Sequence, residues 1–138
     1  MAYRVREVNY FSLSLPNRAG QVEKILREVR SAEINLYAFT GFPQKAGKTQ
    51  VDLVTDESTK LQRIAKKNSW RVSKTKKAFL VTGNDEIGAV HKVLKKLADD
   101  KISVVAADAV SAGTGHYGMI LWVKPKVYSR AARALKAV

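Results

Sequence analysis

Two stretches of this chain match one another and decide its fold: residues 17–36 read NRAGQVEKILREVRSAEINL, and residues 85–104 read DEIGAVHKVLKKLADDKISV. They align without a gap at an offset of 68 residues. In each stretch a glycine, Gly20 or Gly88, precedes apolar residues that recur at helical spacing. An internal repeat constrains the fold, because the two copies are expected to share the same secondary structure. The alignment therefore predicts one small α/β unit that is present twice in the 138-residue chain.

The flanking sequence extends the match on both sides. Alternating apolar residues predict strands at 10–15 and 78–82, before the two turns. After each helix the pattern predicts a β-hairpin, formed by 35–39 with 50–55 and by 103–110 with 117–123. A second helix follows in each copy and carries apolar residues at Leu61, Ile64 and Ala65, and at Val127, Ala131, Leu135 and Val138.

The fourth strand of each unit is less regular. The first copy continues into Trp70-Arg71-Val72, whereas the second copy ends at Val138 within its predicted helix. Tyr3-Arg4-Val5 resembles Trp70-Arg71-Val72 and also precedes a first strand. Either each short strand pairs locally, or the N-terminal strand crosses over to the second unit, and the sequence leaves both options open.

With that strand each unit becomes βαββαβ, the ferredoxin-like arrangement of two helices on one face of a four-stranded antiparallel sheet. The expected class is α+β, with two such units, internally duplicated. We expect the units at residues 1–76 and 77–138, with residues 2–8 as the candidate fourth strand of the second.

Composition excludes several kinds of site. Without cysteine there are no disulfides, thiolate zinc sites or cysteine nucleophiles, and the two histidines are too few for a histidine-rich metal cage. Neither His91 nor His116 has a nucleophile or paired carboxylate at a matching position in the other copy. We therefore expect no enzyme activity, cofactor or metal. No apolar run could span a bilayer and the N-terminus does not resemble a secretory signal, which favours a cytoplasmic protein and no membrane partner.

The formal charge of +13 is concentrated in two segments. Between Glu57 and Asp85 there are eight cations and no acid, and after Asp108 there are five more cations and no acid. Lysine-rich second helices could contact phosphate groups without reading a base sequence. Nucleic acid, or another acidic partner, is therefore an alternative function. The competing interpretation is an ordinary solvated helix face.

The candidate site is the turn between first strand and first helix: Asn17, Arg18, Ala19 and Gly20 in one copy, and Asp85, Glu86, Ile87 and Gly88 in the other. A glycine allows close backbone approach, and a helix N-terminus offers unpaired N–H groups to an anion. A side-chain oxygen can accept a hydrogen bond from an ammonium group. An amino acid carries both charges. The alternative is that Asn17 and Asp85 only cap their helices.

These motifs resemble a tandem pair of ACT domains, small ligand-binding modules attached to many enzymes of amino-acid metabolism. The family pattern is a strand, Asp-x-Pro-Gly, an apolar helix, and a Gly-Ile-Asn-Ile-type entry into the second strand. Here the entries are Glu33-Ile34-Asn35-Leu36 and Lys101-Ile102-Ser103-Val104, so Glu33 and Lys101 replace the glycine. Ala19 and Ile87 replace the proline, and Asn17 replaces the first acid.

The resemblance implies a non-catalytic regulatory module. ACT domains pair side by side and hold an amino acid between the strand–helix turn of one domain and the second strand of its neighbour. That implies ligand contacts at both turns and, opposite them, at Asn35, Leu36, Ser103 and Val104, with Asp85 as the contact to the ammonium group. It also implies a homodimer or higher homo-oligomer, and an unidentified protein partner that the module regulates.

Overall fold

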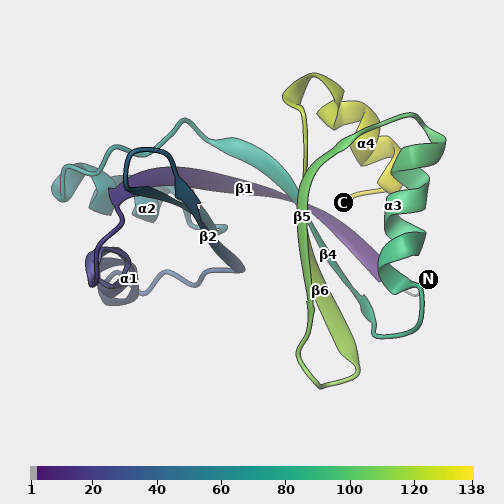
Figure 1. Ribbon diagram of the computed structural model, residues 1–138, viewed down its shortest axis with the longest axis horizontal. Coiled ribbons are helices and arrows are strands. Elements are labelled where there is room, and N and C mark those ends of the chain that lie inside the picture. Colours follow the sequence, from purple (N-terminus) through teal and green to yellow (C-terminus); the bar gives the residue numbers. More distant parts are fainter. Residues whose placement is uncertain (1–2) are drawn as a thin grey trace. The chain divides into compact units, whose positions relative to one another are not determined.

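The fold is α+β, and the computed structural model describes it over residues 3–138 (Figure 1). The elements in chain order are β1 (Tyr3–Pro16), α1 (Gln21–Ser31), β2 (Ala38–Gln44), β3 (Lys48–Val54), α2 (Ser58–Lys67), β4 (Lys76–Asn84), α3 (Ala89–Asp99), β5 (Val104–Ser111), β6 (His116–Val123), a 3₁₀ turn (Pro125–Val127) and α4 (Tyr128–Leu135). The ferredoxin-like α+β prediction is confirmed. Among residues 3–138, no helix is both long enough and apolar enough to cross a membrane.

The chain divides into two compact units. One contains residues 9–76 and is called here the 9–76 unit. The other contains residues 77–138 together with the chain up to Val8 and is called the 77–138 unit. The boundary falls within β1, so one continuous strand contributes to both units.

In the 9–76 unit, β1 and β2 flank β3 in an antiparallel sheet. Its core brings alternate strand residues, Phe11 and Leu13 among them, against the apolar sides of α1 and α2. Ile25 and Val29 supply the stripe on α1, and Leu61 supplies the contact from α2. Apolar side chains recur every two residues in the strands and about every 3.6 residues in the helices, and both sets are buried in this one core.

In the 77–138 unit the strand order is β1-β4-β6-β5, and β6 pairs antiparallel with both β4 and β5. The core combines strand residues with residues of α3 and α4, and its fully buried members include Phe79, Leu97, Leu121 and Leu135. Val5, from the N-terminal end of β1, is 3% exposed and belongs to this same core. The strand order leaves β5 at an edge, paired on one side only.

Three sequence predictions differ from the structure. Val138 was expected inside the last helix, but α4 ends at Leu135. Lys136 adopts φ +53°, which turns the chain back toward β1. Val138 N–H then donates to the Val5 carbonyl at 3.0 Å, and its own carbonyl accepts from Glu7 N–H at 2.9 Å. The last three residues therefore leave the helix, and Val138 bonds to β1 instead.

The second difference concerns the strand expected at 35–39, because β2 begins only at Ala38. Asn35 and Leu36 lie in the connection after α1, where the Asn35 N–H donates to the Glu57 carboxylate at 3.3 Å. The third concerns Trp70-Arg71-Val72, which forms a single β-bridge, Leu13 with Val72, rather than a full strand. Trp70 N–H is still bonded to the end of α2, at the Ala65 carbonyl, so the chain is extended only beyond it.

Each α-helix of the described chain ends with a non-glycine residue in the left-handed region. These residues are Glu33, Ser69, Lys101 and Lys136, with φ between 53° and 57°. The N–H of the following residue bonds back five positions, for example from Ile102 to the Leu97 carbonyl at 2.9 Å. This is the Schellman arrangement, in which glycine is usual because it has no Cβ.

Candidate functional site

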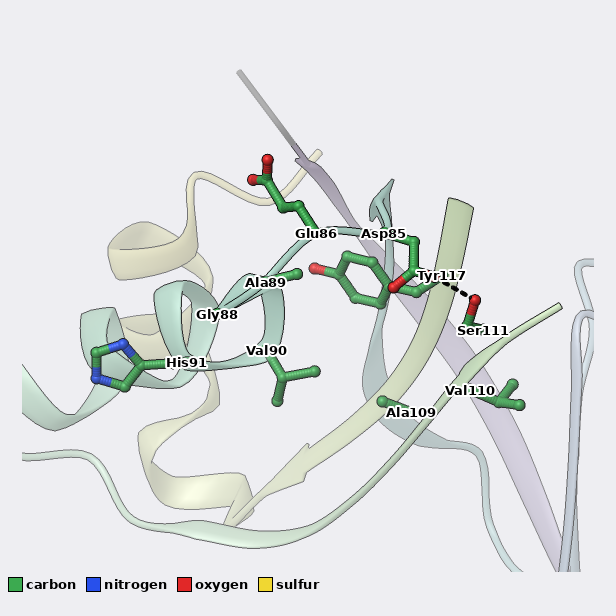
Figure 2. Close-up of a pocket in the computed structure, with 10 residues that line it drawn as sticks. All are labelled: Asp85, Glu86, Gly88, Ala89, Val90, His91, Ala109, Val110, Ser111 and Tyr117. Atoms are coloured by element: carbon green, nitrogen blue, oxygen red, sulfur yellow. Dashed lines mark hydrogen bonds between the residues drawn. The ribbon is translucent and has the colours of Figure 1, made fainter. Parts of the chain in front are cut away.

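A pocket of about 280 Å³ lies in the 77–138 unit between the turn that starts α3 and the β5–β6 hairpin (Figure 2). The turn and the helix supply Asp85, Glu86, Gly88, Ala89, Val90 and His91, and the hairpin supplies Ala109, Val110, Ser111 and Tyr117. Sequence analysis predicted the turn residues as a site. The structure adds the hairpin as the opposite wall.

Asp85 is held in place at this pocket. Ser111 donates its hydroxyl to Asp85 Oδ2 at 2.5 Å, the dashed contact of Figure 2. The Asp85 N–H donates to the Gly115 carbonyl at 3.0 Å, which fixes the backbone of the turn to the hairpin. A carboxylate oriented in this way can accept a further hydrogen bond from a cationic group.

The start of α3 is uncapped by any side chain. Gly88 is the N-cap residue, with φ +78°, and no side chain bonds to the first-turn amides. Ala89 N–H bonds to the Glu86 carbonyl at 3.1 Å, but the next two amides, of Val90 and His91, have no intrahelical acceptor. Both residues line the pocket, so the positive end of the helix dipole lies at it.

The capping interpretation of the two turns is wrong for both copies. Asp85 bonds to Ser111 rather than to the helix. In the first copy, Gly20 is the N-cap residue with φ +85°, and Asn17 makes no side-chain cap. At each turn the glycine alone provides the backbone conformation that starts the helix.

Tyr117 contributes a buried phenol. It is 6% exposed, and its hydroxyl makes no hydrogen bond within residues 3–138. In Figure 2 its ring lies between Asp85 and Ala89, with the hydroxyl toward the turn. Burial, with smaller effects of Tyr3 and Glu86, raises the pKa of Tyr117. The hydroxyl therefore stays neutral near pH 7 and lies under the turn as an unused donor.

The charged residues around Asp85 have separate roles. Glu86 forms an ion pair with Lys92 at 2.7 Å, so its charge is compensated within the unit. The His91 ring points away from Asp85 and Tyr117 in Figure 2. Within residues 3–138, no group of three or more acidic or histidine side chains could hold a metal ion.

The predicted site residues of the second copy are only partly brought together. Asp85, Glu86 and Gly88 line the pocket, but the Ile87 side chain is fully exposed and is not part of its lining. Ser103 lies just before β5 and Val104 is its first residue, and neither lines the pocket.

The predicted site residues of the first copy lie in the other unit. Asn17, Arg18, Ala19 and Gly20 form the exposed turn between β1 and α1, where Asn17 N–H donates to the Gly47 carbonyl at 2.8 Å. Asn35 is exposed and Leu36 is half-buried in the connection to β2. Lys60, and then the Asn35 amide, lower the pKa of the Glu57 carboxyl group that faces Asn35.

Sequence reasoning missed the hairpin residues that complete the pocket. The signal was available in the predicted hairpin of 103–110 with 117–123, because extending its register by one residue places Ser111 opposite Tyr117. Ser111 was placed in the loop, and the polar partner of Asp85 was therefore not recognised.

Comparison with known proteins gives structural likeness only. No family model matches the chain, and no curated protein matches it in sequence. A protein of Bacteroides thetaiotaomicron, BT0572, superposes with a TM-score of 0.80 at 16% identity, covering 99% of this chain and 90% of that one. The regulatory subunit of aspartate kinase from Thermus flavus gives 0.62 at 9% identity, covering 99% and 95%.

A third structure is aspartokinase III of E. coli in complex with lysine and aspartate. It gives a TM-score of 0.60 at 17% identity, and the match covers 98% of this chain but 32% of the enzyme. The chain thus shares its fold with a regulatory subunit of one aspartate kinase and with part of another.

Proposed function

We propose that this chain is a non-catalytic regulatory module that binds a free amino acid in the Asp85 pocket. The observation that carries the proposal is that one pocket combines a carboxylate with the positive end of a helix dipole. The Asp85 carboxylate, oriented by Ser111, suits an ammonium group. The uncapped start of α3 suits a carboxylate, through the Val90 and His91 amides.

The size and the walls of the pocket agree with such a ligand. Pockets for drug-sized molecules are usually about 300–1,000 Å³, and this pocket of about 280 Å³ lies just below that range, which suits a smaller ligand. Ala89, Val90, Ala109 and Val110 supply small apolar walls. Further support comes from the shared fold, since one enzyme with it was crystallised with lysine and aspartate.

We further propose that two copies pair through β5. Residues Val105–Ser111 of this edge strand are all exposed, and Val105 and Val110 are 59% and 69% exposed. An exposed apolar edge strand presents unpaired N–H and C=O groups that a second strand can bond. Because Ala109, Val110 and Ser111 also line the pocket, pairing there places the neighbour next to the ligand.

Regulation then follows from linkage. An amino acid that binds one assembly state more tightly than another shifts the balance between them by its difference in affinity. A change of assembly alters the surface offered to a protein partner. We propose that this partner, rather than chemistry in the chain itself, carries the output.

A thermal-shift screen against the twenty amino acids tests the proposal. A ligand specific to the folded state stabilises it by about 2.7 kcal/mol at a concentration 100 times Kd, so one or two amino acids should raise Tm by several degrees. Asp85→Asn, which keeps an acceptor for Ser111 but removes the charge, should abolish the shift. The matched variant Asn17→Ala, at the same position of the other turn, should keep it. If no amino acid shifts Tm, or if Asp85→Asn responds like the wild type, the proposal fails.

A further inference from the structure

The exposed side of α2 carries a set of cations that the amino-acid pocket does not involve. Lys60, Arg63, Lys66 and Lys67, here called the α2 basic face, are all exposed. On a helical wheel they occupy the side opposite Leu61 and Ala65, which are buried in the core of the 9–76 unit. The segment that follows α2 adds exposed Arg71 and Lys74.

Most of these cations have no internal partner. Lys60 pairs with Glu57 at 3.1 Å, whereas Arg63, Lys66, Lys67, Arg71 and Lys74 form no ion pair within residues 3–138. Helix α3 is different, because Lys92 and Lys95 pair with Glu86 and Asp99 at 2.7 and 2.9 Å. The absence of any acid between Glu57 and Asp85 produces this contrast.

The fold gains little from this arrangement. Like charges three or four residues apart repel one another, and Arg63 has such neighbours in Lys60, Lys66 and Lys67. Lys66 and Lys67 lie in the last turn of α2, where the negative end of the helix dipole stabilises positive charge. That effect is confined to the last turn and does not account for Arg63, Arg71 or Lys74. A bound polyanion would attract each of these cations and so offset the repulsion between them.

We propose that the α2 basic face binds the phosphate backbone of nucleic acid without reading its sequence. Its cations recur every three or four residues, roughly 4.5–6 Å along the axis, so they form one exposed helix face with a single sign of charge, the kind of surface that neutralises phosphates in sequence-independent binding. Thr59 and Gln62 lie between the cations, so the face lacks the apolar and aromatic anchors typical of a protein interface. Strand β3 carries no aromatic residue on which bases could stack.

The test is the salt dependence of binding to a labelled single-stranded RNA of mixed sequence, about 20 nucleotides long, followed by fluorescence anisotropy. For a single strand, log K falls with log salt with a slope of about −0.7 per phosphate contact. Five contacts give about −3.5, or a loss of roughly 100-fold between 50 and 200 mM KCl. A second RNA of unrelated sequence should bind equally well.

Two variants of equal charge locate the surface. Arg63→Gln with Lys66→Gln and Lys67→Gln should reduce the slope by about 2 and weaken binding at low salt. Lys24→Gln with Lys45→Gln and Lys48→Gln removes three exposed cations elsewhere in the same unit and should leave most of the binding intact. Circular dichroism and Tm check that both variants fold.

Three results would overturn the proposal. One is no RNA binding at low salt. Another is equal weakening by both triple variants, which would mean that only net charge matters. The third is binding of poly-glutamate of the same charge as tightly as RNA and with the same slope, which would assign the surface to acidic proteins instead.

Discussion

At the scale of single residues, the residues that follow the helices adopt a backbone conformation that is unfavourable for any residue with a Cβ. Lys101 adopts φ +57° after α3, and Glu33 adopts the same φ after α1. A residue with a Cβ pays about 1–2 kcal/mol for that conformation. The ACT pattern that this sequence resembles has glycine at these two positions, and glycine adopts this conformation without a Cβ penalty.

Replacing Lys101 by glycine should therefore stabilise the protein. Lys101→Gly relieves the strained conformation, and part of the gain is offset by the extra freedom of glycine in the unfolded chain. The side chain is exposed, so no packing is lost. We expect urea denaturation to show a gain of about 0.5–1 kcal/mol in the free energy of unfolding.

The matched control is Lys95→Gly, an exposed position inside α3. There the backbone is helical, so glycine should destabilise by about 1 kcal/mol, apart from the lost ion pair to Asp99. Destabilisation by both substitutions would contradict the strain argument.

The burial of Tyr128 predicts that the free energy of unfolding depends on pH. Its hydroxyl donates to the Ala78 carbonyl at 2.8 Å, and its ring stacks on Phe79 with centroids 4.4 Å apart. Burial, and then the Glu7 carboxylate, raise the pKa of Tyr128 well above its usual range. Because the unfolded chain ionises first, near pH 10, the neutral buried phenol stabilises fully below that pH and progressively less above it.

The variant Tyr128→Phe separates this effect from the rest of the protein. At pH 8 it should cost about 1 kcal/mol, since the Ala78 carbonyl loses its donor. Above pH 10 the free energy of unfolding of the wild type should fall more steeply than that of the variant, and urea titrations from pH 8 to about 11.5 measure both. Parallel curves would contradict the assigned cause.

At the scale of elements, the sequence predicted most helices and strands because their burial is periodic. The stripes of α1 and α3 and the alternation in β1 each follow a single face, whereas β3 and β6 are buried at consecutive residues. Prediction failed where hydrogen bonds rather than side-chain burial decide the structure. Asn35 bonds to Glu57, and Val138 bonds to β1, and neither contact leaves a periodic signal in the sequence.

The edge strands give a prediction about assembly. If copies pair through β5, Val105→Lys should raise the dimer dissociation constant at least tenfold, because a lysine on an exposed edge discourages strand pairing. Val105 is 59% exposed and does not line the pocket, so folding and ligand contacts should be unaffected. Sedimentation equilibrium measures the change.

The contrasting variant is Phe42→Lys, on the other edge strand, β2, where Phe42 is 43% exposed. It should leave the dimer intact. A monomeric wild type at about 100 μM, or dissociation by Phe42→Lys instead of Val105→Lys, would contradict pairing through β5.

At the scale of the whole molecule, β1 is the feature that sequence reasoning could not decide. The pattern predicted two short strands, at 3–5 and 10–15, and left the partner of the first open. In the structure both lie in one strand of 14 residues, divided between the units near Val8. Val5 packs with Phe79 and Leu121, far along the chain, and a contact of that range has no local signature.

The pocket, too, could be predicted only where its residues are close together in the sequence. The turn containing Asp85 and Gly88 was predicted from local sequence, and its glycine conformation follows from local geometry. Ser111 and Tyr117 come from a hairpin that the chain reaches only after α3, and only the fold brings them to the turn.

The central claim is that an amino acid binds between the start of α3 and β5, and the most direct measurement is a ¹H–¹⁵N NMR titration with the amino acid that gives the largest thermal shift. The account predicts that the strongest shift changes fall on amides of residues 85–91 and 109–111, above all Val90 and His91, and that they disappear in Asp85→Asn. Changes centred on residues 17–20 alone, or spread over the chain without regard to the pocket, would contradict it.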